Sequence, residues 1–155
     1  MLRTVLAISV ALALVAGANA AIITYNFPLS GLEEVPPNAS PATGFASVQL
    51  DTATNLLSWN ITYSGLVAPV TASHFHEAPP GVNGPIRVNV GALPSPIIGN
   101  AVITDDFKAA ILAGNAYYNL HTTQFPGGEI RGQVVPEPAS LALLALAGVA
   151  ALRRR

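Results

Sequence analysis

The sequence contains no cysteine and few charged residues. None of its 155 residues is a cysteine, which excludes a disulfide framework and a thiolate metal site. Only 10% of the residues are Asp, Glu, Lys or Arg, whereas 51% are hydrophobic. Two apolar runs, one at each end of the chain, account for much of this bias. Without disulfides, the central part must be held together by its own core, and roughly 115 residues are enough for that.

The central part, residues 21–135, also lacks a basic stripe. It holds seven acids and three bases, for a net charge of −4. The acids are Glu33, Glu34, Asp51, Glu77, Asp105, Asp106 and Glu129, and the bases are Arg87, Lys108 and Arg131. A mildly acidic domain is a poor ligand for phosphate backbones, so nucleic acid is not an expected partner.

The N-terminus has the layout of a secretory signal peptide. A short basic start that includes Arg3 precedes an apolar run over residues 5–16, which only Ser9 interrupts. Ala18 and Ala20 then form the small-x-small pattern that signal peptidase reads, and cleavage is predicted after Ala20. A membrane anchor or a buried helix is the alternative, but the run of about 12 residues is short for a span of ~20. Residues 1–20 are therefore interpreted as a signal peptide.

The C-terminus, residues 136–155, has similar components in reverse order. They are the motif Val135, Pro136, Glu137 and Pro138, an uncharged apolar segment at 139–152, and the basic tail Arg153, Arg154 and Arg155. As a helix the apolar segment covers ~21 Å, less than the ~30 Å hydrocarbon core. The two prolines keep the glutamate between them in an extended, protease-accessible stretch. The basic tail is expected to stay cytoplasmic, which makes the membrane contact of 139–152 transient.

Motif, short apolar helix and basic tail together resemble the PEP-CTERM sorting signal of bacterial envelope proteins. The resemblance implies recognition by an exosortase, removal of the tail, and release or attachment at the cell surface. Before this processing the protein is expected to be anchored in the inner membrane through 139–152. A plain C-terminal membrane anchor is the alternative.

Between the two ends, predicted strands alternate with turn clusters. The segments 45–50 and 57–63 alternate apolar and polar residues around a turn at 51–55, which predicts a hairpin with one buried face. Further strands are predicted at 22–27, 70–76, 86–90, 116–122 and 129–135. No repeat or internal domain boundary is visible. The pattern predicts a single all-β domain, an antiparallel β-sandwich or Greek-key-like arrangement.

One short helix is predicted within this β domain. Thr104 suits the N-cap position, two aspartates follow in the first turn, and Gly114 is placed to end the helix. Its narrow apolar stripe consists of Phe107, Ala110 and Ile111. A helix of this length is not stable alone, so it must pack on the strands.

Several phrases of the central part resemble the CHRD domain, first described in chordin and widespread in bacterial exported proteins. In the family's order they are SGLEEVPP at 30–37, ATGFA at 42–46, ASHFHEA at 72–78, GPI at 84–86, YNLHTT at 118–123 and PGGEIRGQ at 126–133. The resemblance spans roughly residues 22–135. It implies a place outside the cell, in agreement with the two sorting signals, but no established chemistry.

All three histidines of the chain lie in these phrases. His74 and His76 are two apart on a predicted strand, so they point to the same face. His121 is expected on the polar face of the last hairpin. If these strands are neighbours, the three imidazoles meet in the pattern of an open zinc or copper site. A His-x-His pair also opens the metal site of copper/zinc superoxide dismutase, although the further histidines of that enzyme are absent here.

A hydrogen-bonded network that fixes the loops is the leading interpretation of these histidines. Asn119, Glu129 and Arg131 are expected on the same face as His121. An adjacent guanidinium raises the free energy of a bound divalent cation, which argues against a metal. Neutralisation of Arg131 by Glu129 would weaken that objection, so a metal-binding or redox domain stays as the second hypothesis.

The remaining conspicuous residues point to no chemistry. Trp59 and Tyr63 are expected as core or cross-strand partners, with a sugar-stacking platform, and so a carbohydrate-binding module, as the alternative. No nucleophile–base arrangement is visible, so neither enzyme activity nor a catalytic or cofactor-binding residue is predicted.

The leading functional prediction is a non-catalytic interaction or structural module. The terminal signals predict signal peptidase and exosortase as partners during export, and a final place at the cell surface or in the exopolysaccharide matrix. Exopolysaccharide or surface proteins are the expected binding partners.

Overall fold

The computed structural model describes residues 21–135. The predicted signal peptide and nearly all of the predicted sorting signal lie outside these residues. The elements are β1 (Ile22–Ser30), η1 (Gly31–Glu33), β2 (Thr43–Asp51), β3 (Leu56–Ser64), β4 (Val70–Glu77), β5 (Ile86–Asn89), β6 (Ile97–Val102), α1 (Asp105–Leu112), β7 (Ala116–Thr122) and β8 (Ile130–Gln133). The prediction of an all-β fold with one short helix is confirmed. Sequence reasoning missed β6 and the short 3-10 helix η1.

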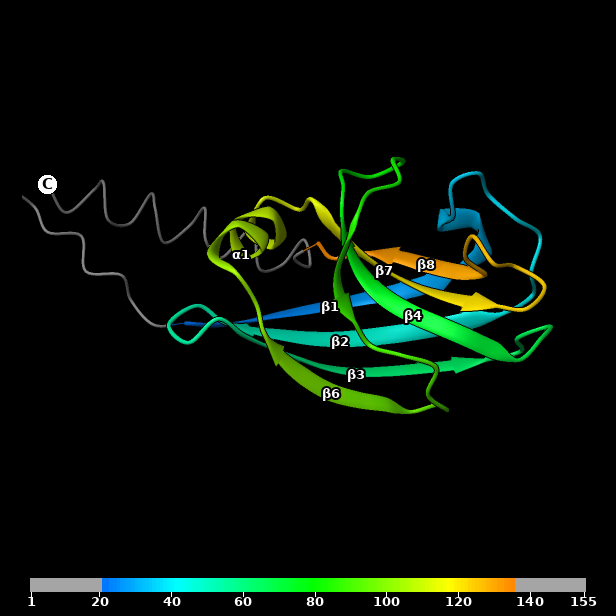
Figure 1. Ribbon diagram of the computed structural model, residues 1–155, viewed down its shortest axis with the longest axis horizontal. Coiled ribbons are helices and arrows are strands. Elements are labelled where there is room, and N and C mark those ends of the chain that lie inside the picture. Colours follow the sequence, from blue (N-terminus) through cyan, green and yellow to red (C-terminus); the bar gives the residue numbers. More distant parts are fainter. Residues whose placement is uncertain (1–20, 136–155) are drawn as a thin grey trace, which may run out of the picture.

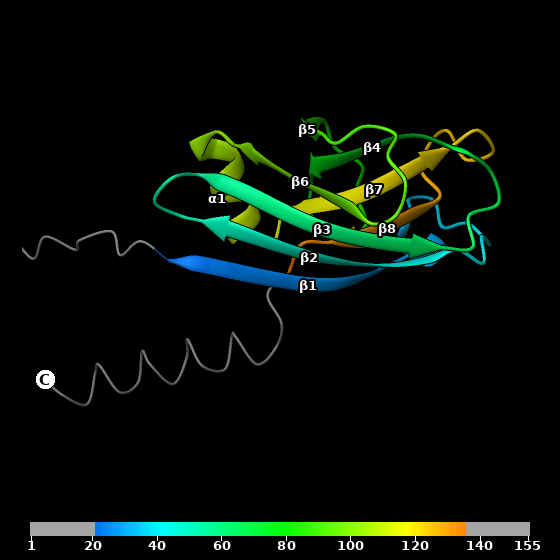
Figure 2. The ribbon, with the colours of Figure 1, turned by 90° about the horizontal axis from the view of Figure 1, so that it is seen from below.

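The strands form one eight-stranded sheet in the order β5-β4-β7-β8-β1-β2-β3-β6. Every neighbouring pair is antiparallel, and β8 meets β1 with Arg131 opposite Ser30. The sheet curls so that its two halves face each other (Figures 1 and 2). Trp59 of β3 packs against Phe75 of β4 with ring centroids 5.4 Å apart. The facing halves correspond to the predicted sandwich, but they belong to one continuous sheet.

The interior of the curled sheet is filled by alternate residues of each strand. In the β2–β3 hairpin, Val48 lies opposite Trp59 and both side chains are buried. The alternation that predicted this hairpin thus identifies its buried face correctly. From β4 and β7, Phe75 and Tyr118 enter the same core, with ring centroids 5.2 Å apart. Because alternate residues face inward, the residues between them form two outer faces, one on each half of the sheet.

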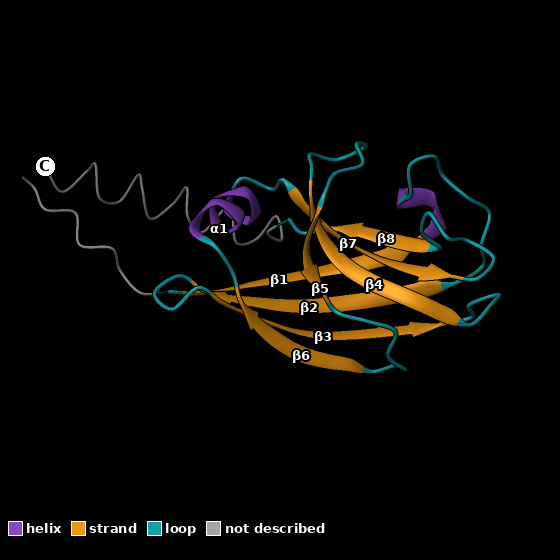
Figure 3. Ribbon diagram, viewed as in Figure 1, coloured by secondary structure: helices purple, strands orange, loops and turns teal. Residues whose placement is uncertain are grey.

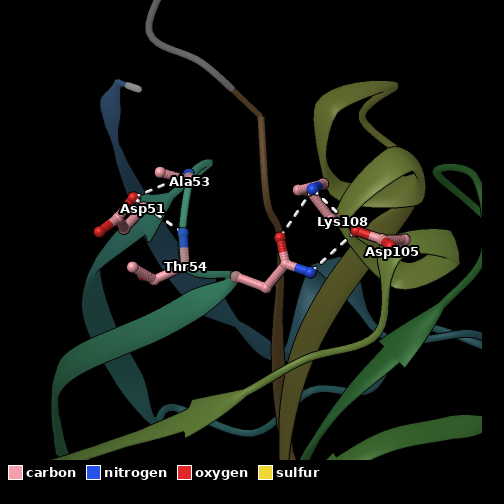
Figure 4. Close-up of polar contacts among 6 residues, drawn as sticks. Asp51, Ala53, Thr54, Asp105 and Lys108 are labelled. Carbon is pink, nitrogen blue, oxygen red and sulfur yellow. Dashed lines mark hydrogen bonds and ion pairs between the residues drawn. The ribbon is translucent and has the colours of Figure 1, made fainter. Parts of the chain in front are cut away.

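The turn between β2 and β3 is held by side chains. The Asp51 carboxylate accepts hydrogen bonds from the backbone N–H groups of Ala53 and Thr54 (Figure 4). Asn55 adopts a positive φ of 59°, a conformation that asparagine tolerates better than most residues. Its side-chain amide reaches the start of α1, where it donates to Asp105. The hairpin turn is therefore tied to the helix.

Helix α1 and η1 lie at opposite ends of the sheet (Figure 3). The predicted apolar stripe of α1 is buried, and Gly114 with φ of 75° follows its end, as expected. Thr104 occupies the N-cap position, but its side chain makes no capping hydrogen bond. Its hydroxyl instead accepts a hydrogen bond from Arg87, because β5 brings that guanidinium to the first turn of the helix.

Within residues 21–135, the structure has no helix that is long and apolar enough to cross a membrane. The apolar segment predicted at 139–152 lies outside the described residues.

Candidate functional site

The three histidines lie together on the outer face of the β4–β7 pair. His74 and His76 are two residues apart on β4, and Phe75 between them points into the core. In the register of β4 and β7, His121 lies opposite Ala72 and Asn119 lies opposite His74. Because residues at spacing two share a face of a strand, all three imidazoles project to one side. The predicted convergence of the histidines is confirmed as geometry.

The imidazoles are in mutual contact. His74 Nδ1 lies 3.2 Å from His121 Nε2, and the ring centroids of His74 and His76 are 5.4 Å apart. One ring nitrogen from each residue lies within 4.8 Å of one from each of the others. In the described part of the chain, these residues form the one group of His, Cys, Asp or Glu side chains that is spaced to hold a metal ion.

Backbone carbonyls fix the tautomer of two of the histidines. His76 Nδ1 lies 2.9 Å from the Gly84 carbonyl oxygen, and His121 Nδ1 lies 2.9 Å from that of Pro126. A carbonyl only accepts hydrogen bonds, so each Nδ1 must carry a proton. The Nε2 atom of each neutral ring is therefore left with a lone pair. Since His121 Nε2 is then an acceptor, His74 Nδ1 is the donor in the contact between these two rings.

The site keeps its imidazoles neutral at pH 7. Burial lowers the pKa of His74 to about 4, and the neighbouring His121 and His76 contribute to the shift. Burial also lowers the pKa of His76 and of His121, although their hydrogen bonds to carbonyls oppose the effect. Neutral imidazoles are the form that binds metal ions.

Arg131 lies on the same face, as predicted, but its hydrogen bonds go to a loop and not to the histidines. The residue is 1% exposed and lies on β8, opposite Asn119 of β7. Its guanidinium donates to the side-chain oxygen of Asn83 and to the carbonyl of Val82. Arg131 thereby holds the loop between β4 and β5 against the sheet, which is the structural role that the sequence reasoning favoured for this face.

Tyr117 separates Arg131 from the histidines. The guanidinium carbon of Arg131 lies 3.4 Å from the Tyr117 ring centroid. His76 stacks on the same ring with centroids 4.8 Å apart and an interplanar angle of 4°. Sequence reasoning assigned Tyr117 no role, although its spacing of two and four residues from Asn119 and His121 places it on their face.

The expectation that Glu129 lies on this face was wrong, so it does not neutralise Arg131 there. Its fully buried carboxylate accepts hydrogen bonds from Ser40, the Val67 N–H and Thr122. Strand β8 begins at Ile130, so the alternation of the strand does not govern the direction of the residue before it. Glu129 thereby ties the loops that contain Ser40 and Val67 to the end of β7.

Glu34 is a buried acid to which the sequence analysis assigned no role. Its side chain is 4% exposed, and burial raises its pKa to about 7 even though the nearby Arg131 opposes the shift. It borders an open cavity of about 240 Å³ formed by residues 34–38 and 124–128. The Asn119 side chain lies within reach of both Glu34 and His76, but Glu34 Oε1, Asn119 Oδ1 and His76 Nε2 make no hydrogen bond of normal geometry. The region beside the histidines therefore holds several buried polar atoms whose hydrogen-bonding capacity is unused.

The aromatic residues of β3 do not form an exposed platform. Trp59 is only 7% exposed because it packs against Phe75, and the Tyr63 hydroxyl donates to the Leu93 carbonyl. Sugar stacking on Trp59 is therefore wrong as a route to carbohydrate binding, whereas the expectation of core packing is confirmed.

The opposite half of the sheet presents an outer face of a different character, which we call the neutral face. It is defined by Thr24, Asn26, Phe45, Ser47, Gln49, Ser58, Asn60, Thr62, Ile98 and Asn100 of β1, β2, β3 and β6. Asp51, at one end, is the only ionisable side chain on the outer side of these described strands. In the described residues no side-chain hydrogen bond engages Ser58, Asn60 or Gln49.

Comparisons with known proteins assign both parts of the chain. A PEP-CTERM protein-sorting motif matches residues 134–155 and confirms the sorting signal predicted from the motif at Val135–Pro138 and the basic tail. This motif marks the protein for exosortase processing and export to the cell envelope. No curated protein and no solved structure matches the chain. The CHRD domain model matches residues 25–134, a span that includes most of β1 and all of the other strands, and the chain therefore belongs to the CHRD domain family.

Proposed function

We propose that this protein is a non-catalytic interaction module outside the cell, and that its neutral face binds an uncharged polysaccharide of the surrounding matrix. The observation that carries the proposal is the arrangement of free, uncharged hydrogen-bonding side chains on that face. The PEP-CTERM motif supports export to the cell envelope, which agrees with a ligand outside the cell.

The polar side chains of the neutral face form rows across the strands. One row runs through residues 24, 49, 58 and 100, since Gln49 lies opposite both Thr24 and Ser58, and Ser58 lies opposite Asn100. The next row runs from residue 26 through 47 and 60 to 98. Strands lie about 4.8 Å apart, so each row offers hydroxyl and amide groups at regular intervals across the sheet.

This chemistry suits sugars without charge. Hydroxyl and primary amide groups both donate and accept hydrogen bonds, which matches the hydroxyl groups of a neutral polysaccharide. Phe45 is 50% exposed and Ile98 is 68% exposed, and they offer apolar contact to the C–H faces of sugar rings. A shallow hollow of about 350 Å³ on this face is lined mainly by the polar side chains of β2, β3 and β6, and Ile98 borders it. A charged polymer would find few partners of opposite charge here.

The binding proposal is tested with two matched substitutions, each of which replaces an asparagine by a lysine. Asn60 lies at the centre of the neutral face, whereas Asn89 is an exposed asparagine of β5 on the other half of the sheet. We expect Asn60→Lys to weaken retention by neutral matrix polysaccharide at least tenfold in affinity electrophoresis, and Asn89→Lys to leave it unchanged. Equal retention of both variants, or no retention of the exported wild-type protein, contradicts the proposal.

The place of action is tested separately. We propose that the chain is held in the inner membrane through 139–152 until exosortase removes the C-terminal segment. Fractionation of cells that produce the chain with and without residues 135–155 should find the two products in different locations, and only the full chain should change in mass on sorting. An identical, uncleaved product in the same fraction would rule out sorting as the route.

A further inference from the structure

We propose that His74, His76 and His121 form a three-nitrogen site for a late first-row transition-metal ion, which binds Cu²⁺ more tightly than Zn²⁺ and leaves a coordination position open. The site lies on the opposite half of the sheet from the neutral face. It does not depend on the proposed function.

The first support is that two ligand nitrogens are already prepared. In metal sites, a ligand histidine commonly donates its second ring N–H to a backbone carbonyl, which fixes the tautomer and orients the ring. His76 and His121 both do so through Nδ1, to Gly84 and Pro126. Each therefore offers the lone pair of Nε2. The lone pair of His121 Nε2 accepts from His74 Nδ1, but that of His76 Nε2 is free, which a network that served only to fix the loops would not need.

The second support is an unused buried nitrogen. His76 is 8% exposed, and its Nε2 has no hydrogen-bond partner. Leaving such an atom buried without a partner costs about 1–3 kcal/mol. Asn119 Oδ1, in the position opposite His74, is likewise buried without a partner. A bound cation would satisfy the lone pair of His76 and thereby remove part of this cost.

The spacing fits after a small adjustment. Two imidazole nitrogens bound to one ion at 2.0–2.1 Å in tetrahedral geometry are about 3.4 Å apart. His74 Nδ1 and His121 Nε2 are already 3.2 Å apart. The ligand nitrogens of the whole set lie within 4.8 Å, so rotation of the imidazole rings must close at most about 1.4 Å.

Binding requires one change at His74. In the free site its Nδ1 donates to His121 Nε2, so these two nitrogens share a proton that the ion must displace. The proton moves to His74 Nε2, which gives the other neutral tautomer and frees the Nδ1 lone pair. All three rings remain neutral throughout, and no proton is released to solvent. The hydrogen bond between His74 and His121 is thus exchanged for two bonds to the metal.

The donor set selects the class of ion. Three imidazoles without a carboxylate favour Cu²⁺ and Zn²⁺ over Ca²⁺ and Mg²⁺, which prefer oxygen. Cu²⁺ stands above Zn²⁺ in the general order of stability for nitrogen ligands. The positive charge of Arg131 opposes the binding of any cation, but the Tyr117 ring lies between Arg131 and His76. The guanidinium N–H groups of Arg131 also donate to Val82 and Asn83.

The test uses the exported protein, produced from the full chain without a polyhistidine tag, so that these are its only histidines. We expect one equivalent of Cu²⁺ per chain, with nitrogen hyperfine structure in its electron paramagnetic resonance spectrum. His74→Ala and His121→Ala should each weaken binding at least tenfold. Lys108→Ala is the matched control, because the Lys108 amine donates hydrogen bonds to Asn55 and Asp105 and not to the histidines. This variant should bind Cu²⁺ as the wild type does. Uptake below a tenth of an equivalent, or equal uptake by every variant, overturns the proposal.

A second measurement needs no variant and so does not depend on whether variants fold. In ¹⁵N spectra of the wild-type imidazoles, saturating Zn²⁺ should shift the Nε2 resonances of His76 and His121 while their Nδ1 atoms stay protonated. Spectra that do not change on addition of Zn²⁺ overturn the site, whatever the behaviour of the neutral face.

Discussion

The guanidinium of Arg131 lies over the Tyr117 ring, with its central carbon 3.4 Å from the ring centroid. Strands β4 and β8 flank β7, so Arg131 and His76 reach Tyr117 from neighbouring strands on opposite sides. This stack places a buried charge one aromatic ring away from the imidazoles. On one side of the Tyr117 ring Arg131 holds the loop between β4 and β5, and on the other side His76 has an Nε2 atom without a hydrogen-bond partner.

Arg131 is predicted to be a major contributor to stability. We expect Arg131→Ala to lower the free energy of unfolding at pH 7 by about 3 kcal/mol, because it removes a fully buried side chain that packs on the Tyr117 ring and makes hydrogen bonds to Val82 and Asn83. Urea denaturation followed by the fluorescence of Trp59, the one tryptophan of the chain, measures this change. Arg87→Ala, which removes a more exposed arginine, should cost less. Equal losses for the two variants would contradict the assignment.

Glu34 is predicted to make stability depend on pH near neutrality. Burial raises its pKa from 4.5 to about 7 in the folded protein, so the folded state favours the protonated carboxyl. Its contribution is complete below pH 4.5 and is lost as the pH rises through 7. Relative to wild type, Glu34→Gln should therefore gain about 1–3 kcal/mol between pH 4.5 and pH 8.5.

Thermal unfolding of both proteins across this pH range checks the prediction. Glu33→Gln is the control, because Glu33 is the exposed neighbour of Glu34 on η1, and its stability profile should run parallel to that of wild type. A parallel profile for Glu34→Gln as well would show that the buried carboxyl does not titrate in this range.

Glu129 and Thr122 are predicted to be energetically coupled. Thr122 donates a hydrogen bond of 2.6 Å to the buried Glu129 carboxylate, and hydrogen bonds to charged groups contribute about 1.5–3 kcal/mol. A double-mutant cycle with Glu129→Gln and Thr122→Val should give a coupling energy above about 1 kcal/mol. The pair Glu33→Gln and Thr122→Val should be additive, and a coupling near zero in the first cycle would refute a shared network.

Much of the fold follows from local pattern, as the β2–β3 hairpin and the His74–His76 pair illustrate. In both cases the period-two alternation of an extended chain decides which side chains share a face. Strand β6 was missed because Pro94 and Pro96 precede it and Gly99 interrupts it, which reads locally as a loop. It forms because pairing with β3 and the burial of Ile97 outweigh these preferences.

The site was predictable only in part, for a related reason. Alternation placed the histidines on one face, but the error at Glu129 arose one residue before β8, where alternation no longer applies. The hydrogen bonds from His76 to Gly84 and from His121 to Pro126 join strands to loops, and their geometry depends on the loop conformation. The burial of Glu34 likewise comes from long-range contact, since the turn that ends at Gly128 covers it.

Gly84 is predicted to connect loop geometry to the imidazoles. A Cβ atom at this position would overlap the backbone carbonyl of Glu77, so Gly84→Ala must push the loop between β4 and β5 away from β4. The variant should then lose the hydrogen bond that fixes His76, and its free energy of unfolding should fall by about 2 kcal/mol. In ¹⁵N spectra, His76 should change from the Nδ1–H form to a mixture of tautomers.

Gly127→Ala is the matched control, because nothing lies within 4 Å of a Cβ there, and it should leave both the stability and the His76 tautomer unchanged. If Gly84→Ala also preserves the tautomer, the Gly84 carbonyl does not orient this ring.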